Sequence, residues 1–370
     1  MVKKTSIALL VILTVLTGPL LTGPLLTGLV LTGSLLRGSA LTIFELTEKK
    51  PSSFPSISPM IKFFFNPQMA HAKEKITCPK TNKQSVKVVE VAKNIYVRKG
   101  LNEIFTKNNL AAIATISFVI GEKSVAVIDT GGSYCDGARL LSVIRKITDK
   151  PISHVINTHT HPDHIFGNAA FEKEGAVFVG HKNLKRAMAD RGKIYLENLT
   201  RIMGKDQLVG TKLIPPSLLV SKTKTIDLGN KKLELRAFGT AHTDHDLTVF
   251  DPELKIIWTG DLLFHEHTPV VDGSLLGWLK EMKELSKIPA KFVIPGHGGP
   301  LLKWPKALEP QQDYLEKLTA DLRKIIEEGG TMHEAQKRAA VSERKKWKLF
   351  EEFNARNASP FDHDSKLRTL

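Results

Sequence analysis

The sequence predicts an α/β fold in which mixed β-sheets are covered by helices. From residue 86 onward, short β-branched and apolar runs, bounded by Gly and Asp turns, alternate with segments whose apolar residues recur at helical spacing. This strand, helix, strand succession repeats along the chain and favours sheets with helices packed on them. The 370 residues suffice for one catalytic domain with extensions.

The individual elements follow from these local patterns. A turn at Gly121–Lys123 joins two strands as a hairpin, and Gly229-Asn230 marks a second turn. Thr331 and Glu334 have the spacing of a helix capping box. The predicted strands are 86–97, 113–120, 125–128, 154–157, 176–179, 226–238, 247–250, 255–258 and 291–294, and the predicted helices are 136–147, a polar insertion at 182–207, and 309–328.

The first 72 residues are predicted to be an export leader or a membrane anchor. Lys3 and Lys4 precede an apolar stretch without any charged residue before Arg37. Regularly spaced glycines and prolines weaken a continuous spanning helix there, so a cleaved signal peptide is favoured over N-terminal membrane attachment. The two candidate cleavage sites are Ala70-His71-Ala72 and, as the alternative, Gly38-Ser39-Ala40.

Charge and cysteine content limit the partners and the covalent cross-links that the chain can have. The formal charge of +15 is interpreted as solvated helical surface, and we expect no nucleic-acid partner. Cys78 and Cys135 allow one disulfide without requiring it, and a small buried thiol is the favoured interpretation of Cys135. We divide the chain into the leader, a catalytic domain at 73–302 and a C-terminal helical extension at 303–370.

Metal-ligand side chains are concentrated directly after the strand predicted at 154–157. Residues 158–164 read Thr-His-Thr-His-Pro-Asp-His. His159 and His161 alternate along an extended segment and therefore point in the same direction. The two rings can hold one metal ion together.

The second half of this motif predicts a second ion. Pro162 turns the chain and re-aims Asp163 and His164 toward a neighbouring position. An ion there could lie about 3.5 to 4 Å from the first. Imidazole nitrogen and carboxylate oxygen suit zinc, with iron or manganese as alternatives, so we expect two Zn²⁺ per chain.

Further ligands are needed to complete two sites, and later strands supply them. His242, Asp261 and His297 each follow a predicted strand, with glycine close by. Strand ends of this kind place all three residues on one edge of the sheet. Among the remaining histidines, His245 and His265 are candidates for lining the pocket, and His154 and His181 are interpreted as structural.

This ordered set resembles the metallo-β-lactamase superfamily over about residues 88–300. The family pattern is H-x-H-x-D-H, then a lone His, then Asp after Gly, then His in a Gly-rich turn. The resemblance implies an αββα sandwich, and Asp129, in the segment Ile-Asp-Thr-Gly-Gly, would support the ligand loop by hydrogen bonds. It also assigns His159, His161 and His242 to the first metal, Asp163, His164 and His297 to the second, and Asp261 to both.

Two bound cations would generate hydroxide near neutral pH, and the natural target is an ester, thioester or lactone carbonyl. Asp163 would bind metal and position this bridging nucleophile. Asp261 stands where cysteine-dependent β-lactamases carry their cysteine ligand, so β-lactam hydrolysis is an alternative and is not favoured. An iron-dependent oxidoreductase of the same fold is a further hypothesis, and a purely structural metal site is the hypothesis without catalysis.

A closer resemblance is to an exported subgroup, the quinoprotein relay system zinc metallohydrolases. It rests on residues 157–171, 267–274, Gly277-Trp278 and 354–357. The resemblance implies an exported, periplasmic protein, or one anchored to the outer face of the inner membrane. It also implies a small-molecule substrate and a periplasmic quinoprotein dehydrogenase system as partner.

Overall fold

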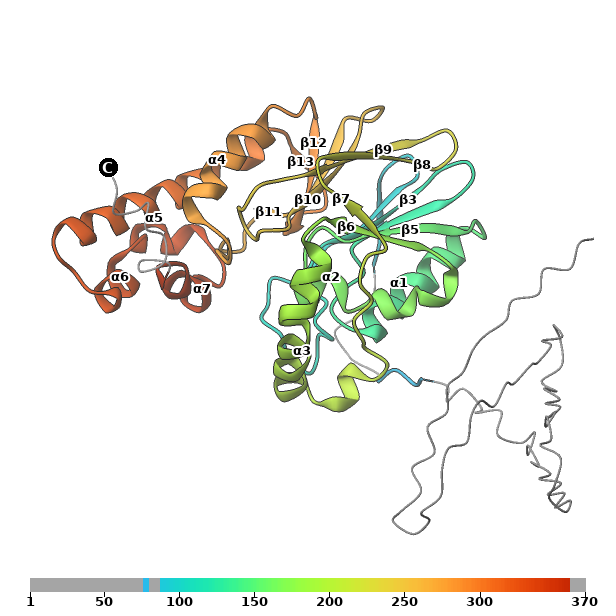
Figure 1. Cartoon of the computed structure of the whole chain (residues 1–370), viewed down its shortest axis with the longest axis horizontal. Coiled ribbons are helices and arrows are strands. Elements are labelled where there is room, and N and C mark those ends of the chain that lie inside the picture. Colours follow the sequence, from blue (N-terminus) through green and yellow to red (C-terminus); the bar gives the residue numbers. More distant parts are fainter. Residues whose placement is uncertain (1–75, 80–86, 360–370) are drawn as a thin grey trace, which may run out of the picture. The chain divides into compact units, whose positions relative to one another are not determined.

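The computed structural model describes residues 76–79 and 87–359 (Figure 1). The chain divides into two units, Met1–Ala72 and Lys73–Leu370, and all the described elements belong to the second. The predicted leader and both predicted cleavage sites lie outside the described residues. Within the described ranges, no helix is both long enough and apolar enough to cross a membrane.

Two mixed β-sheets form the centre of the second unit. In the first sheet, strands β1 to β4 pair antiparallel and β4 to β7 pair parallel. In the second, β11 and β12 are parallel and the other neighbours antiparallel. The first sheet comprises β1 Val89–Ala92, β2 Ile95–Arg98, β3 Ile116–Ile120, β4 Val125–Ile128, β5 Ile152–Ile156, β6 Val177–His181 and β7 Leu218–Val220; the second comprises β8 Thr223–Asp227, β9 Lys232–Ala237, β10 Leu247–Asp251, β11 Ile256–Phe264, β12 Phe292–His297 and β13 Leu302–Lys303.

Helices cover the outer face of each sheet, which confirms the predicted αββα sandwich. Val119 of β3 and Trp258 of β11 belong to one core between the sheets. Leu140 of α1 packs with the outer face of the first sheet, and Trp278 of α4 packs beyond the second. The helices are α1 Tyr134–Ile147, α2 Pro162–Ile165, α3 Leu184–Met203, α4 Leu275–Ser286, α5 Glu309–Glu327, α6 Met332–Arg338 and α7 Phe350–Asn357.

Several strand predictions were wrong in their bounds. The strand predicted at 291–294 continues as β12 to His297, so His297 ends the strand and does not follow it. The run 86–97 is not one strand, because the chain turns at Asn94 and β1 and β2 pair antiparallel. The φ of Asn94 is +63°, and a positive φ is incompatible with continuous extended backbone. The strand predicted at 255–258 continues as β11 to Phe264, so Asp261 lies within a strand and does not follow it. A register shift near Gly260 lets the strand continue.

The interpretation of Cys135 as a small buried thiol was wrong in one respect: Cys135 is buried, but its sulfur is in a disulfide. Cys135, the second residue of α1, forms a disulfide with Cys78, and the two Cα atoms are 5.5 Å apart. The sequence permitted this bond but could not require it, because the two residues are 57 positions apart. The disulfide ties the chain that precedes β1 to the helical layer of the first sheet.

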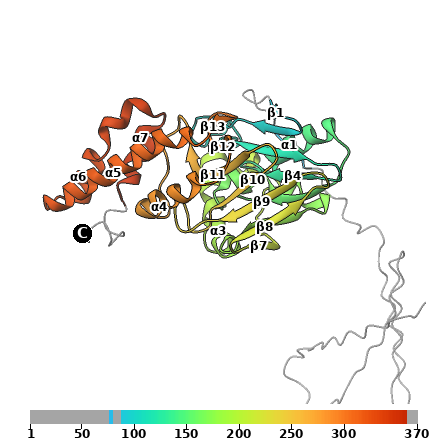
Figure 2. The same cartoon turned by 90° about the horizontal axis from the view of Figure 1, so that it is seen from above.

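The three C-terminal helices pack beside α4, and both views show them grouped there (Figures 1 and 2). Tyr314 of α5 and Phe350 of α7 belong to the same hydrophobic core as Trp278 of α4. The helix predicted at 309–328 is α5, and the capping box of Thr331 and Glu334 begins α6. These helices and the second sheet therefore share one core.

A buried asparagine joins the last helix to the loop after β11. The Asn357 side chain accepts a hydrogen bond from Val271 N (2.9 Å) and donates to Pro269 O (2.6 Å) and Tyr314 Oη (2.8 Å). Asn357 is fully buried, so water cannot replace these partners. The loop that contains Val271 is thus fixed from α7.

Asn357→Ala is expected to lower the free energy of unfolding by about 2 to 3 kcal/mol, because it leaves a buried N–H and a buried carbonyl without partners. Urea unfolding followed by circular dichroism measures this change. Gln312→Ala, on the exposed face of α5, is the control and should shift stability by less than about 0.5 kcal/mol. Equal effects of the two substitutions would contradict the role of Asn357.

Candidate metal centre

Seven ligand-type side chains from separate parts of the chain meet at one edge of the two sheets. His159 follows β5, and the next ligands open α2. His242 follows β9, Asp261 lies in β11, and His297 ends β12. All the residues that the sequence predicted as ligands are brought together, as two groups that could hold a metal ion: His159, His161, His242 and Asp261; and Asp163, His164 and His297.

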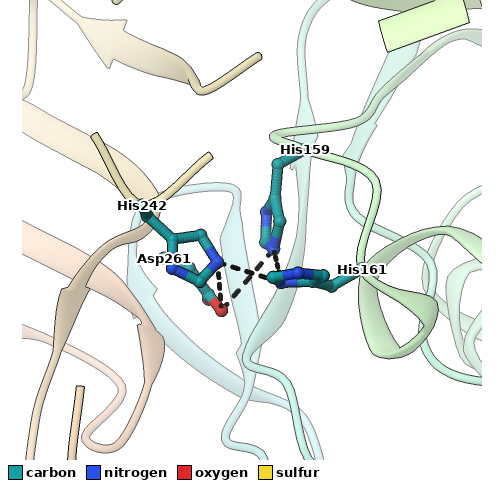
Figure 3. Close-up of side chains that lie close together, drawn as sticks. All are labelled: His159, His161, His242 and Asp261. Carbon is teal, nitrogen blue, oxygen red and sulfur yellow. Dashed lines mark hydrogen bonds and ion pairs between the residues drawn. The ribbon is translucent and has the colours of Figure 1, made fainter. Parts of the chain in front are cut away.

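In the first group, three ring nitrogens and one carboxylate converge on a single point (Figure 3). His161 Nδ1 lies 3.0 Å from His159 Nε2 and 2.9 Å from His242 Nε2. Asp261 Oδ2 lies 3.5 Å from His159 Nε2 and 3.4 Å from His242 Nε2. This donor set suits zinc or another divalent transition metal.

The second group lies on the other side of the Asp261 carboxylate. His297 Nε2 is 3.3 Å from Asp163 Oδ2, and His164 Nε2 is 3.6 Å from the same oxygen. Asp261 Oδ1 lies 3.1 Å from His164 Nε2, and Asp261 Oδ2 lies 3.4 Å from His297 Nε2. Asp261 is therefore the residue shared by both groups, in the position that a bridging ligand requires.

Two glycines allow Asp261 to take this position. Gly260 has a φ of +51°, a left-handed conformation that favours glycine. A Cβ atom on Gly296 would lie 2.0 Å from Asp261 Oδ1. The glycine next to His297 thus leaves room for the carboxylate.

Hydrogen bonds from outside the centre fix the orientation of the His164 and His242 rings. Asp129 Oδ2 accepts from His164 Nδ1 at 2.8 Å, and the same carboxylate accepts from Thr158 N (2.9 Å) and Oγ1 (2.7 Å). His242 Nδ1 donates to Val270 O at 2.6 Å. Each of these bonds leaves Nε2 of the ring facing the centre, as metal coordination requires.

Asp272 supports a third ring, that of His161, and was not among the predicted site residues. Its Oδ2 atom lies 3.2 Å from His161 Nε2, so His161 presents Nδ1 to the centre. The signal available in the sequence was the segment 267–274, which contributed only to a family resemblance. Asp272 also accepts hydrogen bonds from Arg191 and Arg356.

Burial and the neighbouring carboxylates shift the pKa values of the histidines in the centre, and some of the buried polar atoms are left for a cation to bind. Burial lowers the pKa of His242 to about 3. Burial also lowers the pKa of His297, but the carboxylates of Asp261 and Asp163 outweigh it and raise the pKa to about 9. His164 Nε2 and Asp261 Oδ1 are buried and lie 3.1 Å apart, but neither atom forms a hydrogen bond of acceptable geometry with a described residue. Such orphaned atoms are expected where a metal ion binds.

A cavity of about 270 Å³ opens beside the centre. Asp163, Asp261 and His297 line it together with mostly apolar residues of α3, β11 and α7. Neither His245 nor His265 lines this cavity. His267 does, and its ring lies 5.0 Å from the ring of His297 and 5.0 Å from that of Phe353.

The histidines interpreted as structural lie outside both ligand groups and outside the cavity lining. His181 Nδ1 accepts a hydrogen bond from Asn183 N at 3.1 Å. His154 Nδ1 lies 2.9 Å from Ser153 Oγ. Both rings therefore have local partners.

Comparison with known proteins shows which proteins parts of this chain are similar to. The family model of the metallo-beta-lactamase superfamily matches residues 112–297, half of the chain. A linear primary-alkylsulfatase from Pseudomonas sp. is 43% identical over 58 residues, which are 16% of this chain and only 11% of that protein. The probable metallo-hydrolase YqjP of Bacillus subtilis is 24% identical over 247 residues, covering 58% of this chain and 76% of that protein. The structure of a double mutant of the sec-alkyl sulfatase PisA1 matches 74% of this chain and 50% of that one, with 16% identity and a TM-score of 0.58.

Zinc affinity is expected to rise with pH between about 6 and 9. With a pKa of about 9, His297 holds a proton at neutral pH, and the metal must displace it to reach the lone pair. Competition with a chelator at several pH values measures the affinity, which should gain up to about tenfold per pH unit for each displaced proton. An affinity that is constant from pH 7 to 9 would contradict this linkage.

Gly296→Ala is expected to weaken zinc binding by about 10- to 100-fold, because the added methyl group displaces the Asp261 carboxylate. Gly299→Ala is the matched control in the same loop. There a Cβ would meet the flexible Leu302 side chain at 3.1 Å, so affinity should hardly change. Chelator competition compares the two variants. If both bind zinc like the unmodified protein, the fit between Gly296 and Asp261 is not important for the site.

Proposed function

This chain belongs to the metallo-beta-lactamase superfamily, and on that premise we propose that it is a dinuclear zinc hydrolase of small ester, thioester or lactone substrates. The observation that carries the proposal is the Asp261 carboxylate, which lies between two buried groups of ligand side chains beside an open cavity. A closed structural zinc site has four ligands and no cavity beside it.

The residues of this chain have distinct tasks in such a reaction. Two bound divalent cations would supply Lewis acidity and lower the pKa of water toward neutrality. Asp163 lines the cavity and can accept a hydrogen bond from the attacking water. The largely apolar walls limit the entry of bulk water and strengthen the electrostatic interactions inside.

Two competing activities differ from this proposal in substrate or in metal. A β-lactamase activity is supported by the match to the metallo-beta-lactamase superfamily, but Asp261 in place of the cysteine ligand of cysteine-dependent β-lactamases argues against it. An iron-dependent oxidoreductase would use the same ligand set, because imidazole and carboxylate also suit iron. Metal content separates the oxidoreductase from the proposed hydrolase, since zinc does not change its oxidation state.

Hydrolysis of a sulfate ester is a second candidate function. The sequence similarity to a linear primary-alkylsulfatase and the structural similarity to a sec-alkyl sulfatase both favour it. The mostly apolar cavity would suit the alkyl chain of such a substrate. An alkyl sulfate therefore belongs in any substrate panel.

We also propose that the protein is exported to the periplasm, or anchored to the outer face of the inner membrane. The charged start and uncharged apolar stretch of the first 36 residues support export. The similarity of residues 157–171 and 267–274 to quinoprotein relay system zinc metallohydrolases supports a quinoprotein dehydrogenase system as its partner.

The test measures metal content and hydrolysis together on the purified protein. We expect about two zinc ions per chain and metal-dependent hydrolysis of at least one member of a panel of thioester, lactone, β-lactam and alkyl sulfate. Asp163→Ala and His242→Ala should each lower kcat/KM by at least about a hundredfold, because each removes a ligand side chain at the metal.

His154→Ala is the matched control, since His154 is a histidine with a local partner and no place in the centre. It should retain both zinc and activity. Iron in place of zinc would favour the oxidoreductase. Bound zinc without hydrolysis of any substrate, combined with unfolding when the metal is chelated, would favour a structural site.

A further inference from the structure

Two arginines meet one aspartate beside the candidate metal centre. Arg191 Nη1 of α3 donates to Asp272 Oδ2 at 2.5 Å, and Arg356 Nη2 of α7 donates to Asp272 Oδ1 at 3.1 Å. The Asp272 side chain is 17% exposed, whereas those of Arg191 and Arg356 are 47% and 53% exposed. The carboxylate thus fixes two guanidinium groups that remain open to solvent.

This cluster lies on the far side of the His161 ring from the other ligands. His161 presents Nδ1 to the centre and Nε2 to Asp272. A group bound at the guanidinium of Arg356 would therefore be separated from the reacting bond by at least the width of an imidazole ring. It would not be the group that is hydrolysed.

The charge of the cluster is unbalanced. One carboxylate faces two guanidinium groups, while His161, when it binds metal, is neutral. Among the described residues, Arg356 donates one hydrogen bond, to Asp272. Most of the five N–H donors of the Arg356 guanidinium are therefore available. A planar guanidinium fork held by a half-buried carboxylate is suited to bind a second, incoming anion.

Apolar side chains connect Arg356, the member of this cluster that lines the cavity, with the metal centre. Arg356 and Phe353 of α7 line the same cavity as Tyr195 and Ile202 of α3, and the metal ligands line it too. Ile202 is 50% exposed although it is a large hydrophobic residue. Ile202 thus adds to the apolar wall of the cavity, against which an apolar part of a ligand can pack.

We propose that the substrate is an amphiphilic anion, in which a short apolar chain separates the hydrolysable group from a carboxylate or similar anion that Arg356, with Arg191, binds. This inference rests on the proposed hydrolase function and specifies its substrate class. It also gives the C-terminal extension a role in substrate selection, since α7 lies beyond the residues that the family model matches.

The experiment compares two chromogenic esters on the zinc-loaded full-length protein: the mono(4-nitrophenyl) ester of adipic acid and 4-nitrophenyl hexanoate. They share a six-carbon acyl chain and differ in the terminal carboxylate. We expect a kcat/KM about tenfold higher for the anionic ester, and Arg356→Gln should abolish this preference by raising KM for that ester. Arg356→Lys, which keeps the charge but not the fork, should retain part of it.

Arg338→Gln is the matched control. Arg338 is also an arginine of the C-terminal helices, pairs with Glu328 and is 48% exposed. This variant should keep the full preference for the anionic ester. An Arg356→Gln variant that loses activity equally on both esters would overturn the proposal and assign Arg356 a purely structural role, as would a wild-type protein without preference.

A binding measurement separates failure of this inference from failure of the proposed function. If the zinc-loaded protein hydrolyses neither ester, titration calorimetry with hexane-1-sulfonate and 1-hexanol still tests the anion site. We expect sulfonate binding to weaken about tenfold in Arg356→Gln while 1-hexanol binding stays unchanged. Equal sulfonate affinity in the two proteins would show that Arg356 does not bind the anion.

Discussion

The Asp261 carboxylate lies between two groups of buried histidines, and the rest of the structure depends on keeping it there. Each oxygen of Asp261 faces ring nitrogens that converge from several segments. Burying so many polar atoms costs free energy unless their lone pairs are satisfied, and the rings cannot satisfy one another. Bound cations would resolve this conflict, because each would accept several of these lone pairs at once.

The scaffold holds the ligands through a second layer of hydrogen bonds from different elements. Asp129, at the end of β4, fixes His164, while a backbone carbonyl after β11 fixes His242. That same loop is bound by Asn357 of the last helix. The C-terminal helices therefore stabilise the loop that orients a ligand. The C-terminal helices thus hold this loop in place, and α7 also lines the cavity beside the centre.

The sequence could predict those parts of the site that depend on neighbouring residues, and not those that depend on residues far apart in the chain. His159 and His161 were predictable as a pair because strand geometry alone places alternate side chains on one side. Strand bounds failed where one residue with positive φ, Asn94, interrupted an apolar pattern. Asp272 and its partner Arg356 were not predicted, because they are 84 positions apart and no local period connects them. Only the folded chain brings α7 to the cavity.

The same reasoning indicates where substrate selectivity arises. A centre of histidines and carboxylates can polarise a carbonyl, a sulfate ester or a lactam, so the ligands discriminate little among them. Discrimination must come from groups that touch the part of the substrate that does not react. In this chain such groups come from α3 and α7, through Tyr195, Phe353 and Arg356. We therefore expect selectivity to depend on α3, which follows the ligand motif closely in sequence, and on α7, which lies far from it.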